Sequence, residues 1–342
     1  MKVAVYHNNN DVRIEEMPIP LLLDGEILVR TDSCGVCVGD TMEWYLTPRA
    51  PLTFGHEATG TIEAVSPQVK NFKPGDRVAV HHHVACLNCE HCRRGNFTMC
   101  ETFRKTHIRP GGFSEFFIAS SIHVERDTLL LPDHVSFEAG TLIEPLACVV
   151  HAIRNANIQP GDSVALIGTG TMGLMFIQTL LYWGVRDLVV YEVLDWRIKK
   201  ALEFGAPNVL IPDRDPEKEA IRIREILGSD GADKVIIAAK DIGAMKLGMR
   251  IANKGGTATF FATPHPDEFV ELYPSYIFFN EITLNSTYSA DHLDTRLALD
   301  LISNGDVSAE KLISHRFPLE KLSDAILQTI SRQESLKCII KF

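Results

Sequence analysis

Three features that the sequence lacks exclude whole classes of function. No apolar run is long enough to span a membrane, because Gln178 and Gly184 interrupt the longest one. Positive charge is in deficit: 34 lysines and arginines against 44 aspartates and glutamates leave a formal net charge of −10, which argues against a nucleic-acid partner. Residues 1–16 lack the apolar core of a signal peptide. We therefore expect a cytoplasmic protein that binds neither membranes nor nucleic acids.

The residues that are present are typical of a globular protein with two domains. A chain of 342 residues is long for a single core. Hydrophobic residues make up 45% and charged residues 23% of it, as in folded globular chains. The chain has eight cysteines. In a chain expected in a reducing compartment, they favour metal binding or catalysis over disulfides.

The kind of predicted element changes along the chain. Residues 1–148 begin with short segments of alternating apolar and polar residues, such as Lys2–Tyr6, which indicate half-buried strands. Residues 149–289 alternate strands with helices, and this order predicts an α/β domain whose doubly wound parallel sheet is covered on both faces. Residues 290–342 are too short to form a domain alone, so we expect them to pack on the first domain.

A glycine-rich segment lies between a predicted strand, Ser163–Ile167, and a predicted apolar helix, Leu174–Trp183. Its glycines have the spacing G-x-G-x-x-G. The first allows a sharp turn, the second lets a pyrophosphate approach the backbone, and the third lets helix and strand pack closely. The exposed N–H groups at the start of the helix would bind the pyrophosphate. We therefore predict a Rossmann-type dinucleotide site whose loop comprises Gly168, Gly170, Thr171, Met172 and Gly173.

The residue after the next strand bears on the choice of cofactor. Strand Leu188–Tyr191 ends in Glu192, about 20 residues after the glycines, where a carboxylate would bind the two hydroxyls of the adenosine ribose. Glu192 would repel the 2′-phosphate of NADP, so NAD is favoured. Arg197 lies close by in the sequence, belongs to the predicted site and keeps NADP as the alternative.

Four cysteines separated by polar residues form the strongest local motif. Their spacing is C-x2-C-x2-C-x7-C, and four thiolates on one short loop suit a tetrahedral zinc ion with Zn–S bonds of about 2.3 Å. An iron–sulfur cluster is the main alternative and unliganded cysteines are another. The ferredoxin motif, however, continues with x3-C-P, whereas Glu101 follows the last cysteine here. We predict a closed structural zinc site in residues 86–100, formed by Cys86, Cys89, Cys92 and Cys100.

Other short motifs lie outside the glycine and cysteine segments. They are Gly35-Val36-Cys37 with Asp40, Gly55-His56-Glu57, the turn Lys73–Val78, Glu144-Pro145 and His315–Leu319. In this order and with these separations, the motifs resemble the zinc-dependent medium-chain alcohol dehydrogenases, including their sorbitol, threonine and glucose dehydrogenase branches. The resemblance covers nearly the whole chain. It implies a GroES-like, β-rich catalytic domain made of residues 1–148 and 290–342, an inserted dinucleotide-binding Rossmann domain made of residues 149–289, and a homodimer or homotetramer.

By this resemblance, Cys37 and His56 are ligands of a catalytic zinc. The residue types agree, because one thiolate and one imidazole suit zinc and a catalytic site keeps one position open for water or substrate. The third ligand stays open between Glu144, which stands where other branches have a second cysteine, and Glu57, next to His56. We expect both carboxylates within reach of the metal, one of them through water. Asp40 is expected to orient a ligand.

The activity that the resemblance implies is hydride transfer between a secondary alcohol or polyol and NAD, with zinc lowering the pKa of the substrate hydroxyl. A threonine-type dehydrogenase, a zinc-free reductase of the same superfamily and a non-catalytic NAD-binding protein that kept the fold are the alternatives. Two residues depart from the family pattern. Gly39 stands where the family has a serine or threonine that passes the proton outward, and Met42 stands where it often has a histidine. Thr41, Glu43 or ordered water would have to release the proton.

The strand predicted after Asp76 ends in a run of three histidines, His81–His83. We expect this run to be strand and turn surface leading to the cysteine segment, because neighbouring residues of a strand point to opposite faces. Metal binding is the alternative for these histidines.

Overall fold

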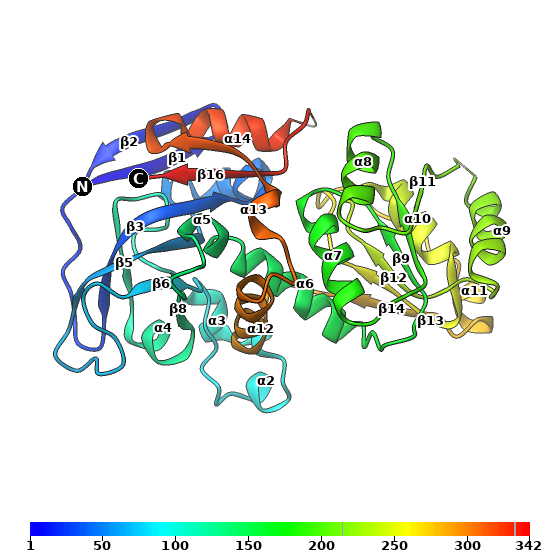
Figure 1. Cartoon of the computed structure of the whole chain (residues 1–342), viewed down its shortest axis with the longest axis horizontal. Helices are drawn as coiled ribbons and strands as arrows, with labels where there is room; N and C mark the ends of the chain where they lie inside the picture. Colours follow the sequence, from blue (N-terminus) through cyan, green and yellow to red (C-terminus); the bar gives the residue numbers. More distant parts are fainter. Residues whose placement is uncertain (214, 332) are drawn as a thin grey trace. The chain divides into compact units, whose positions relative to one another are not determined.

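The structure is a computed structural model and describes residues 1–213, 215–331 and 333–342. The chain divides into two compact units (Figure 1). The first unit comprises Met1–Ala147 and Ala290–Phe342, and the second comprises Cys148–Ser289. Helix α6 (Ile143–Asn155) contains the first point at which the chain passes between them. The chain therefore leaves the first unit, forms the second and returns to the first.

The first unit is built on two sheets of mainly antiparallel strands. Within the described residues, the smaller sheet has the order β2 (Asp11–Glu16), β1 (Lys2–Asn8) and β4 (Leu52–Thr53). The larger sheet has the order β15 (Ile313–Pro318), β16 (Lys337–Lys341), β3 (Ile27–Val36), β5 (Glu57–Val65), β6 (Arg77–Val80) and β8 (Thr128–Leu130), and β7 (Phe116–Ala119) also pairs with β3.

Strand β16 lies between β15 and β3, so the C-terminal segment completes the larger sheet. It runs antiparallel to β3, with Ile339 opposite Gly35 and Ile340 opposite Cys34. The apolar side chains of β16 are fully buried, as is typical of a strand covered on both faces. These pairings join residues of the C-terminal segment to a strand from the beginning of the chain.

The core of the first unit forms where several strands bring their apolar side chains together. Val29 of β3, Ile62 of β5, Val78 of β6 and Phe117 of β7 belong to one buried cluster. Burial of such side chains stabilises the fold by about 25 cal/mol for each Å² of apolar surface removed from water. This core fixes the sheet that carries the loop after β3 and the start of β5.

Short helices connect the strands of the first unit. No helix in the part of the chain that the structure describes is long and apolar enough to cross a membrane. The α-helices besides α6 are α1 (Glu43–Leu46), α2 (Glu90–Arg93), α3 (Glu101–Lys105), α4 (Ser121–Arg126), α5 (Phe137–Gly140), α12 (His292–Ser303), α13 (Ala309–Leu312) and α14 (Leu322–Ile330), and the 3-10 helices are η1 (Val38–Thr41), η2 (Thr47–Arg49), η3 (Phe97–Met99) and η4 (Leu319–Lys321).

The second unit contains a parallel sheet, as its alternation of strands and helices predicts. The strands follow the order β11 (Asn208–Leu210), β10 (Leu188–Tyr191), β9 (Val164–Ile167), β12 (Ala232–Ile237), β13 (Ala252–Phe260) and β14 (Thr283–Ser286). The helices are α7 (Thr171–Tyr182), α8 (Asp195–Glu203), α9 (Pro216–Leu227), α10 (Ile242–Arg250) and α11 (Pro274–Phe279). The strand order reverses between β9 and β12, and such sheets bind ligands beyond the carboxyl ends of their strands at this point. The predicted α/β fold class is confirmed.

Some element boundaries differ from those that the sequence predicts. Alternation of residue types predicts a strand over residues 26–32, but β3 continues to Val36 because its last residues pair with both β5 and β16. Strand β6 ends at Val80, before the three histidines. Strand β11 and helix α11 are too short to give a recognisable period in the sequence.

Candidate functional site

Strand pairing in the first unit brings Cys37 close to His56 and Glu57. Cys37 follows β3 and is the N-cap of η1, while Glu57 is the first residue of β5. Strands β3 and β5 are antiparallel, and Gly35 lies opposite Glu57. As a result, donor atoms of Cys37, His56 and Glu57 lie within 4.8 Å of one another. This cluster of three donors is close enough to share one metal ion.

Asp40 contacts two members of the cluster. Its Oδ2 accepts a hydrogen bond from the backbone N–H of Cys37 (3.0 Å), and its Oδ1 lies 3.3 Å from Nδ1 of His56. Asp40 is itself buried. Because Nδ1 of His56 faces a carboxylate, Nε2 is the nitrogen left for a metal, an arrangement common among metal-bound histidines.

Glu57 has a partner that the sequence analysis did not find. Its Oε2 forms an ion pair with Nζ of Lys337, the first residue of β16, and both side chains are buried. Oε1 of Glu57 has no hydrogen-bond partner within the described chain. A Cβ atom on Gly35 would lie 2.0 Å from Oε2 of Glu57, so only glycine at this position leaves room for the pair.

The charges around His56 suit a cation. Burial lowers the pKa of His56, but Asp40 and Cys37 outweigh burial and raise it well above its ordinary value. Burial raises the pKa of the Cys37 thiol, and His56 opposes this effect. The negative partners that favour a proton on His56 equally favour a metal ion. A thiolate, an imidazole and a carboxylate form a donor set that zinc accepts, so the residues fit a zinc ion.

Glu144 lies in the first turn of α6 and is not one of the three clustered donors. Burial raises the pKa of Glu57 and the charge of Glu144 adds to this, although Lys337 and His56 oppose it. A cavity of about 20 Å³, enough for one water molecule, is lined by both carboxylates together with His56 and His81. The two carboxylates thus border the same small space, but Glu57 is the one grouped with Cys37 and His56.

The three histidines after β6 differ from their predicted arrangement. Because β6 ends at Val80, the alternation of a strand does not apply to them, and His81 is only 4% exposed. Donor atoms of His81, His82 and Glu144 lie within 4.8 Å of one another. Burial lowers the pKa of His83 to about 3. The expectation that this run is surface is therefore wrong for His81.

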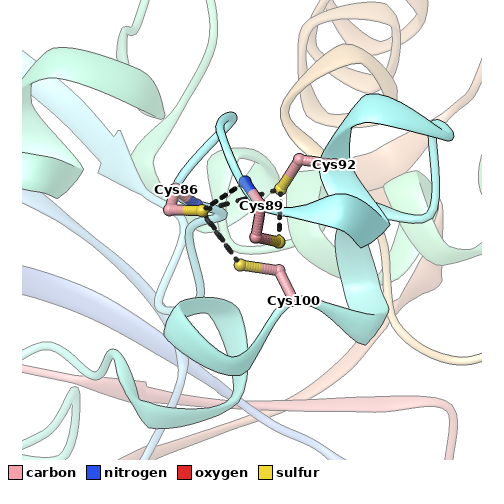
Figure 2. A group of neighbouring side chains, drawn as sticks. All are labelled: Cys86, Cys89, Cys92 and Cys100. Atoms are coloured by element: carbon pink, nitrogen blue, oxygen red, sulfur yellow. Dashed lines mark hydrogen bonds between the residues drawn. The ribbon is translucent and has the colours of Figure 1, made fainter.

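The four predicted cysteine ligands converge on one point (Figure 2). The sulfur atoms of Cys89 and Cys92 lie 3.5 Å apart, those of Cys86 and Cys100 lie 3.6 Å apart, and those of Cys86 and Cys92 lie 3.9 Å apart. A tetrahedron with Zn–S bonds of about 2.3 Å has edges of about 3.8 Å, so the four sulfurs fit one zinc ion. All four cysteines are free of disulfides.

Backbone N–H groups support the sulfur atoms of this site. The N–H groups of Asn88 and Cys89 donate to Sγ of Cys86 at 3.4 and 3.3 Å, and that of Cys86 donates to Sγ of Cys100 at 3.4 Å. The N–H donors of Asn88 and Cys89 lower the pKa of Cys86. Burial raises the pKa of Cys100, but the N–H donors outweigh it and bring the value to about 6. Four sulfur ligands leave no open position, so the site is structural.

In the second unit, the glycine-rich loop joins β9 to α7. Gly168 has a φ of 97°, in the left-handed region that favours glycine. A Cβ atom on Gly173 would lie 2.1 Å from the carbonyl oxygen of Gly168, so a larger residue would force the loop and helix apart. Gly170 is the N-cap of α7, whose first residues are Thr171 and Met172. Without a capping side chain, the first N–H groups of α7 are left for a ligand.

Glu192 follows β10 and contacts this loop. Its Oε2 accepts hydrogen bonds from the backbone N–H and the hydroxyl of Thr169 at 2.9 and 2.8 Å, and its Oε1 accepts from the next two backbone N–H groups at 2.7 and 3.1 Å. Glu192 therefore braces the glycine-rich loop, a role that its sequence motif does not reveal. Arg197, in α8, lies near the same loop, with Nη1 3.9 Å from the position of a Cβ atom on Gly170.

The side chains considered for proton release make other contacts. Oγ1 of Thr41 donates to the carbonyl oxygen of Val38 (2.8 Å), and Oε1 of Glu43 accepts from the backbone N–H of Asn9 (3.1 Å). A Cβ atom on Gly39 would meet only Sγ of Cys37, at an ordinary contact distance of 3.5 Å. A Cβ atom would therefore fit at residue 39, so steric hindrance does not explain why this residue lacks a side-chain hydroxyl.

Known proteins resemble both units. Residues 23–132 match the family described as "Alcohol dehydrogenase GroES-like domain", and residues 171–304 match the family described as "Zinc-binding dehydrogenase". The sorbitol dehydrogenase of Bombyx mori is 31% identical over 335 residues, which cover 94% of this chain and 93% of that protein.

Solved structures share the fold over the whole chain. A protein of Sinorhizobium meliloti 1021 described as a zinc-binding dehydrogenase, bound to NADP, has a TM-score of 0.88 and 25% identity and covers 100% of this chain and 99% of its own. The 2R,3R-butanediol dehydrogenase of Bacillus subtilis has a TM-score of 0.86 and 26% identity, with coverage of 100% and 99%.

Proposed function

The chain belongs to the zinc-dependent medium-chain alcohol dehydrogenases and is an oxidoreductase of alcohols or polyols, and we propose that it oxidises a secondary hydroxyl at the cluster of Cys37, His56 and Glu57. This proposal rests on the convergence of the three donors and on the contact between Oδ1 of Asp40 and Nδ1 of His56. A zinc site with three protein ligands keeps a fourth position for the substrate oxygen.

The roles of the chain's residues follow from their contacts. A zinc ion, when bound, supplies a Lewis acid that lowers the pKa of the substrate hydroxyl. Cys37 and Glu57 supply negative charge to hold the ion, and Asp40 orients the ring of His56 through Nδ1. Lys337 balances the charge of Glu57. Asp40 and Lys337 are therefore positioning residues.

We assign the carboxylate ligand of this zinc to Glu57. Glu57 belongs to the cluster of three donors, and Glu144 does not. Glu144 instead lines the cavity of about 20 Å³ together with Glu57. Glu144 is therefore close to the proposed zinc site without belonging to its three donors.

A secondary alcohol or polyol is the substrate class that we propose. The names of two relatives, sorbitol dehydrogenase and 2R,3R-butanediol dehydrogenase, refer to compounds with more than one hydroxyl group. The family to which the chain belongs supports the same substrate class.

We propose that the second unit binds the dinucleotide over the loop of Gly168, Gly170 and Gly173 and that NAD is preferred. The buried carboxylate of Glu192, bonded to Thr169, puts negative charge next to this loop. That charge disfavours the 2′-phosphate of NADP. Arg197 acts in the opposite direction, because a guanidinium binds phosphate well. Rates with NAD and NADP under equal conditions decide between the two cofactors.

We also propose that the protein is a homodimer or homotetramer in the cytoplasm. Strand β14 is an edge strand, and Tyr273, Phe278 and Phe279 nearby in the sequence are 69%, 75% and 80% exposed. An edge strand and exposed aromatic side chains favour self-association. Thiols held for a metal suit a reducing compartment. Light scattering should give a multiple of 38.1 kDa for the wild type and a smaller mass for Phe278→Ser with Phe279→Ser.

The activity is tested by screening polyols, simple secondary alcohols and threonine with NAD and with NADP, and by measuring zinc alongside. We expect dinucleotide reduction with a polyol or secondary alcohol. Cys37→Ser should abolish activity and remove one zinc ion per chain with the fold retained. Cys148→Ser, at a cysteine outside the donor clusters, is the matched control and should retain both. Fully active protein whose only zinc is bound by the four cysteines would overturn the proposal.

A further inference from the structure

We propose that His81, His82 and Glu144 bind a further divalent metal ion, at a site distinct from the four cysteines and from the cluster of Cys37. Donor atoms of these three side chains lie within 4.8 Å of one another. The site shares no donor residue with the cluster of Cys37, His56 and Glu57. Binding of this ion requires no hydride transfer at the cluster of Cys37.

His81 is held in the way that metal-bound histidines are held. Its Nδ1 bonds to Oδ2 of Asp127 at 2.7 Å, and Oδ1 of Asp127 accepts a hydrogen bond from the hydroxyl of Thr295 at 2.7 Å. His81 and Asp127 are 4% and 1% exposed. A carboxylate on one ring nitrogen orients the ring and leaves the other nitrogen for a metal.

The remaining ring nitrogen of His81, Nε2, is buried and has no hydrogen-bond partner among the residues that the structure describes. The same is true, within those residues, of Nδ1 of His82. An unsatisfied buried polar group costs about 1–3 kcal/mol, so two of them in adjacent residues require an explanation. A shared metal ion satisfies both nitrogens, because each can offer a lone pair.

His82 is held in place by its neighbours. Its carbonyl oxygen accepts a hydrogen bond from Nε2 of His123 at 3.0 Å, and its ring lies 3.8 Å from that of His83, measured between centroids. His83 itself differs from the other two histidines of the run, because its Nδ1 donates to the carbonyl oxygen of Thr106 at 2.6 Å. Among the described residues, His81 and His82 each have a buried ring nitrogen without a hydrogen-bond partner, and His83 is not in the group of donors with Glu144.

The donor set indicates the class of ion. Two imidazoles and one carboxylate suit Zn²⁺, Fe²⁺, Co²⁺ or Ni²⁺, whereas Ca²⁺ and Mg²⁺ prefer oxygen donors. Three protein donors also leave coordination positions for small ligands. The cavity of about 20 Å³ is lined by His81 and Glu144 of this site and by His56 and Glu57 of the other. It has room for one water-sized ligand next to both donor groups.

Titration of the purified, zinc-loaded protein with cobalt(II) tests the site. Equilibrium dialysis with elemental analysis counts the bound metal, and the absorption spectrum shows which donors bind cobalt. Cobalt at either cysteine-containing site gives a thiolate-to-metal charge-transfer band, whereas cobalt at His81, His82 and Glu144 gives none. We expect the wild type to hold one metal ion more than the two cysteine-containing sites account for, and to bind it without growth of this band.

Variants of the three histidines and of Asp127 identify the residues that bind the additional ion. His81→Gln and His82→Gln each remove a nitrogen donor and should lower the affinity for the additional ion by at least ~10-fold, and Asp127→Asn should lower it about 10–100-fold. His83→Gln is the matched control and should bind the ion as the wild type does. Circular dichroism and the unfolding midpoint establish which variants fold.

Two results would overturn the proposal. One is a wild type that saturates with metal at its two cysteine-containing sites alone. The other is a folded His81→Gln or His82→Gln variant that binds the additional ion as tightly as the wild type. The first result needs no variant, so the test decides even if neither substitution is tolerated.

Discussion

Nζ of Lys337 and Oε2 of Glu57, which are far apart in the sequence, form an ion pair inside the first unit, where their side chains are 6% and 0% exposed. Two strand pairings bring them together, because Cys338 of β16 lies opposite Val36 and Glu57 of β5 lies opposite Gly35, both on β3. Glu57 is also the proposed carboxylate ligand of the zinc. Lys337 therefore pairs with one oxygen of this carboxylate and leaves the other, Oε1, for the metal.

In the metal-free protein, Lys337→Met should leave the carboxylate of Glu57 buried without a cationic partner. Removal of one partner from a buried ion pair costs about 3–5 kcal/mol, so we expect a lower urea midpoint. Adding Glu57→Gln should restore much of this loss, because residue 57 then carries no charge that needs a partner. Urea unfolding of the wild type, both single variants and the double variant measures the coupling. A double variant as unstable as Lys337→Met would show that the ion pair is not the cause.

Cys92→Ser should remove one zinc ion per chain and loosen residues 86–100. The sulfur of Cys92 lies 3.5 Å from that of Cys89 and 3.9 Å from that of Cys86, so its loss opens the tetrahedron. Elemental analysis should find about one zinc ion fewer, and limited proteolysis should cut this segment faster. A chelator added to the wild type should have the same effect on cleavage. Equal cleavage of the variant and Cys148→Ser would contradict the prediction.

Substitution of two loop glycines should separate folding from dinucleotide binding. Gly173→Ala places a Cβ atom 2.1 Å from the carbonyl oxygen of Gly168 and should lower the melting temperature. Gly170→Ala meets only Nη1 of Arg197, at 3.9 Å, so stability should be retained. Its methyl group lies where the pyrophosphate is expected, and we expect NADH affinity about 10-fold lower, or 1.4 kcal/mol. A fluorescence titration with unchanged affinity would argue against binding at this loop.

Asp233 should make stability depend on pH. Its Oδ2 accepts from the backbone N–H and hydroxyl of Ser163 at 3.0 and 2.7 Å, and its Oδ1 accepts from Nδ2 of Asn253 at 3.0 Å. Burial raises the pKa of Asp233, but these donors outweigh burial and hold the pKa below its ordinary value of 3.8. Such a depressed pKa contributes stability that is present above pH 3.8 and lost as the pH falls through the folded-state value.

Asp233→Asn should therefore lower the free energy of unfolding by about 1–3 kcal/mol at neutral pH, because the donors of Ser163 and Asn253 lose a charged acceptor. The difference from the wild type should shrink as the pH falls below 3.8 towards the folded-state pKa, where the wild-type carboxyl group becomes protonated. Urea midpoints of both proteins over a series of pH values measure this difference. If it stayed constant into the acid range, ionisation of Asp233 would not be its source.

Local motifs allowed part of the site to be predicted from the sequence. The four cysteines lie within residues 86–100, so their spacing alone limits where their sulfurs can meet, and the structure brings them together. The glycines of residues 168–173 likewise form a turn whose geometry depends on neighbours in the chain. The parallel sheet followed from the alternation of strands and helices. The roles of Cys37, His56 and Glu57 remain predictions that the metal analysis tests.

Contacts between distant segments could not be predicted from local motifs in the same way. A lysine at the start of an apolar strand does not indicate that β16 will place it against Glu57. The hydrogen bonds of Glu192 to Thr169 depend on a side-chain direction that spacing does not determine. The end of β6 at Val80 depends on the pairing of β6 with β5 and β8, and this end decides the arrangement of the histidines.

The position of β16 also sets an order on folding during biosynthesis. All residues of the second unit have been made once Ser289 is added, whereas the larger sheet of the first unit lacks an inner strand until the ribosome has made Lys337–Lys341. Until then, the backbone N–H and C=O groups at the end of β3 that pair with β16 are unpaired. An exposed strand edge of this kind can pair with other chains and cause aggregation. A nascent polypeptide stalled before Lys337 would therefore need a chaperone, although most of its residues had already been translated.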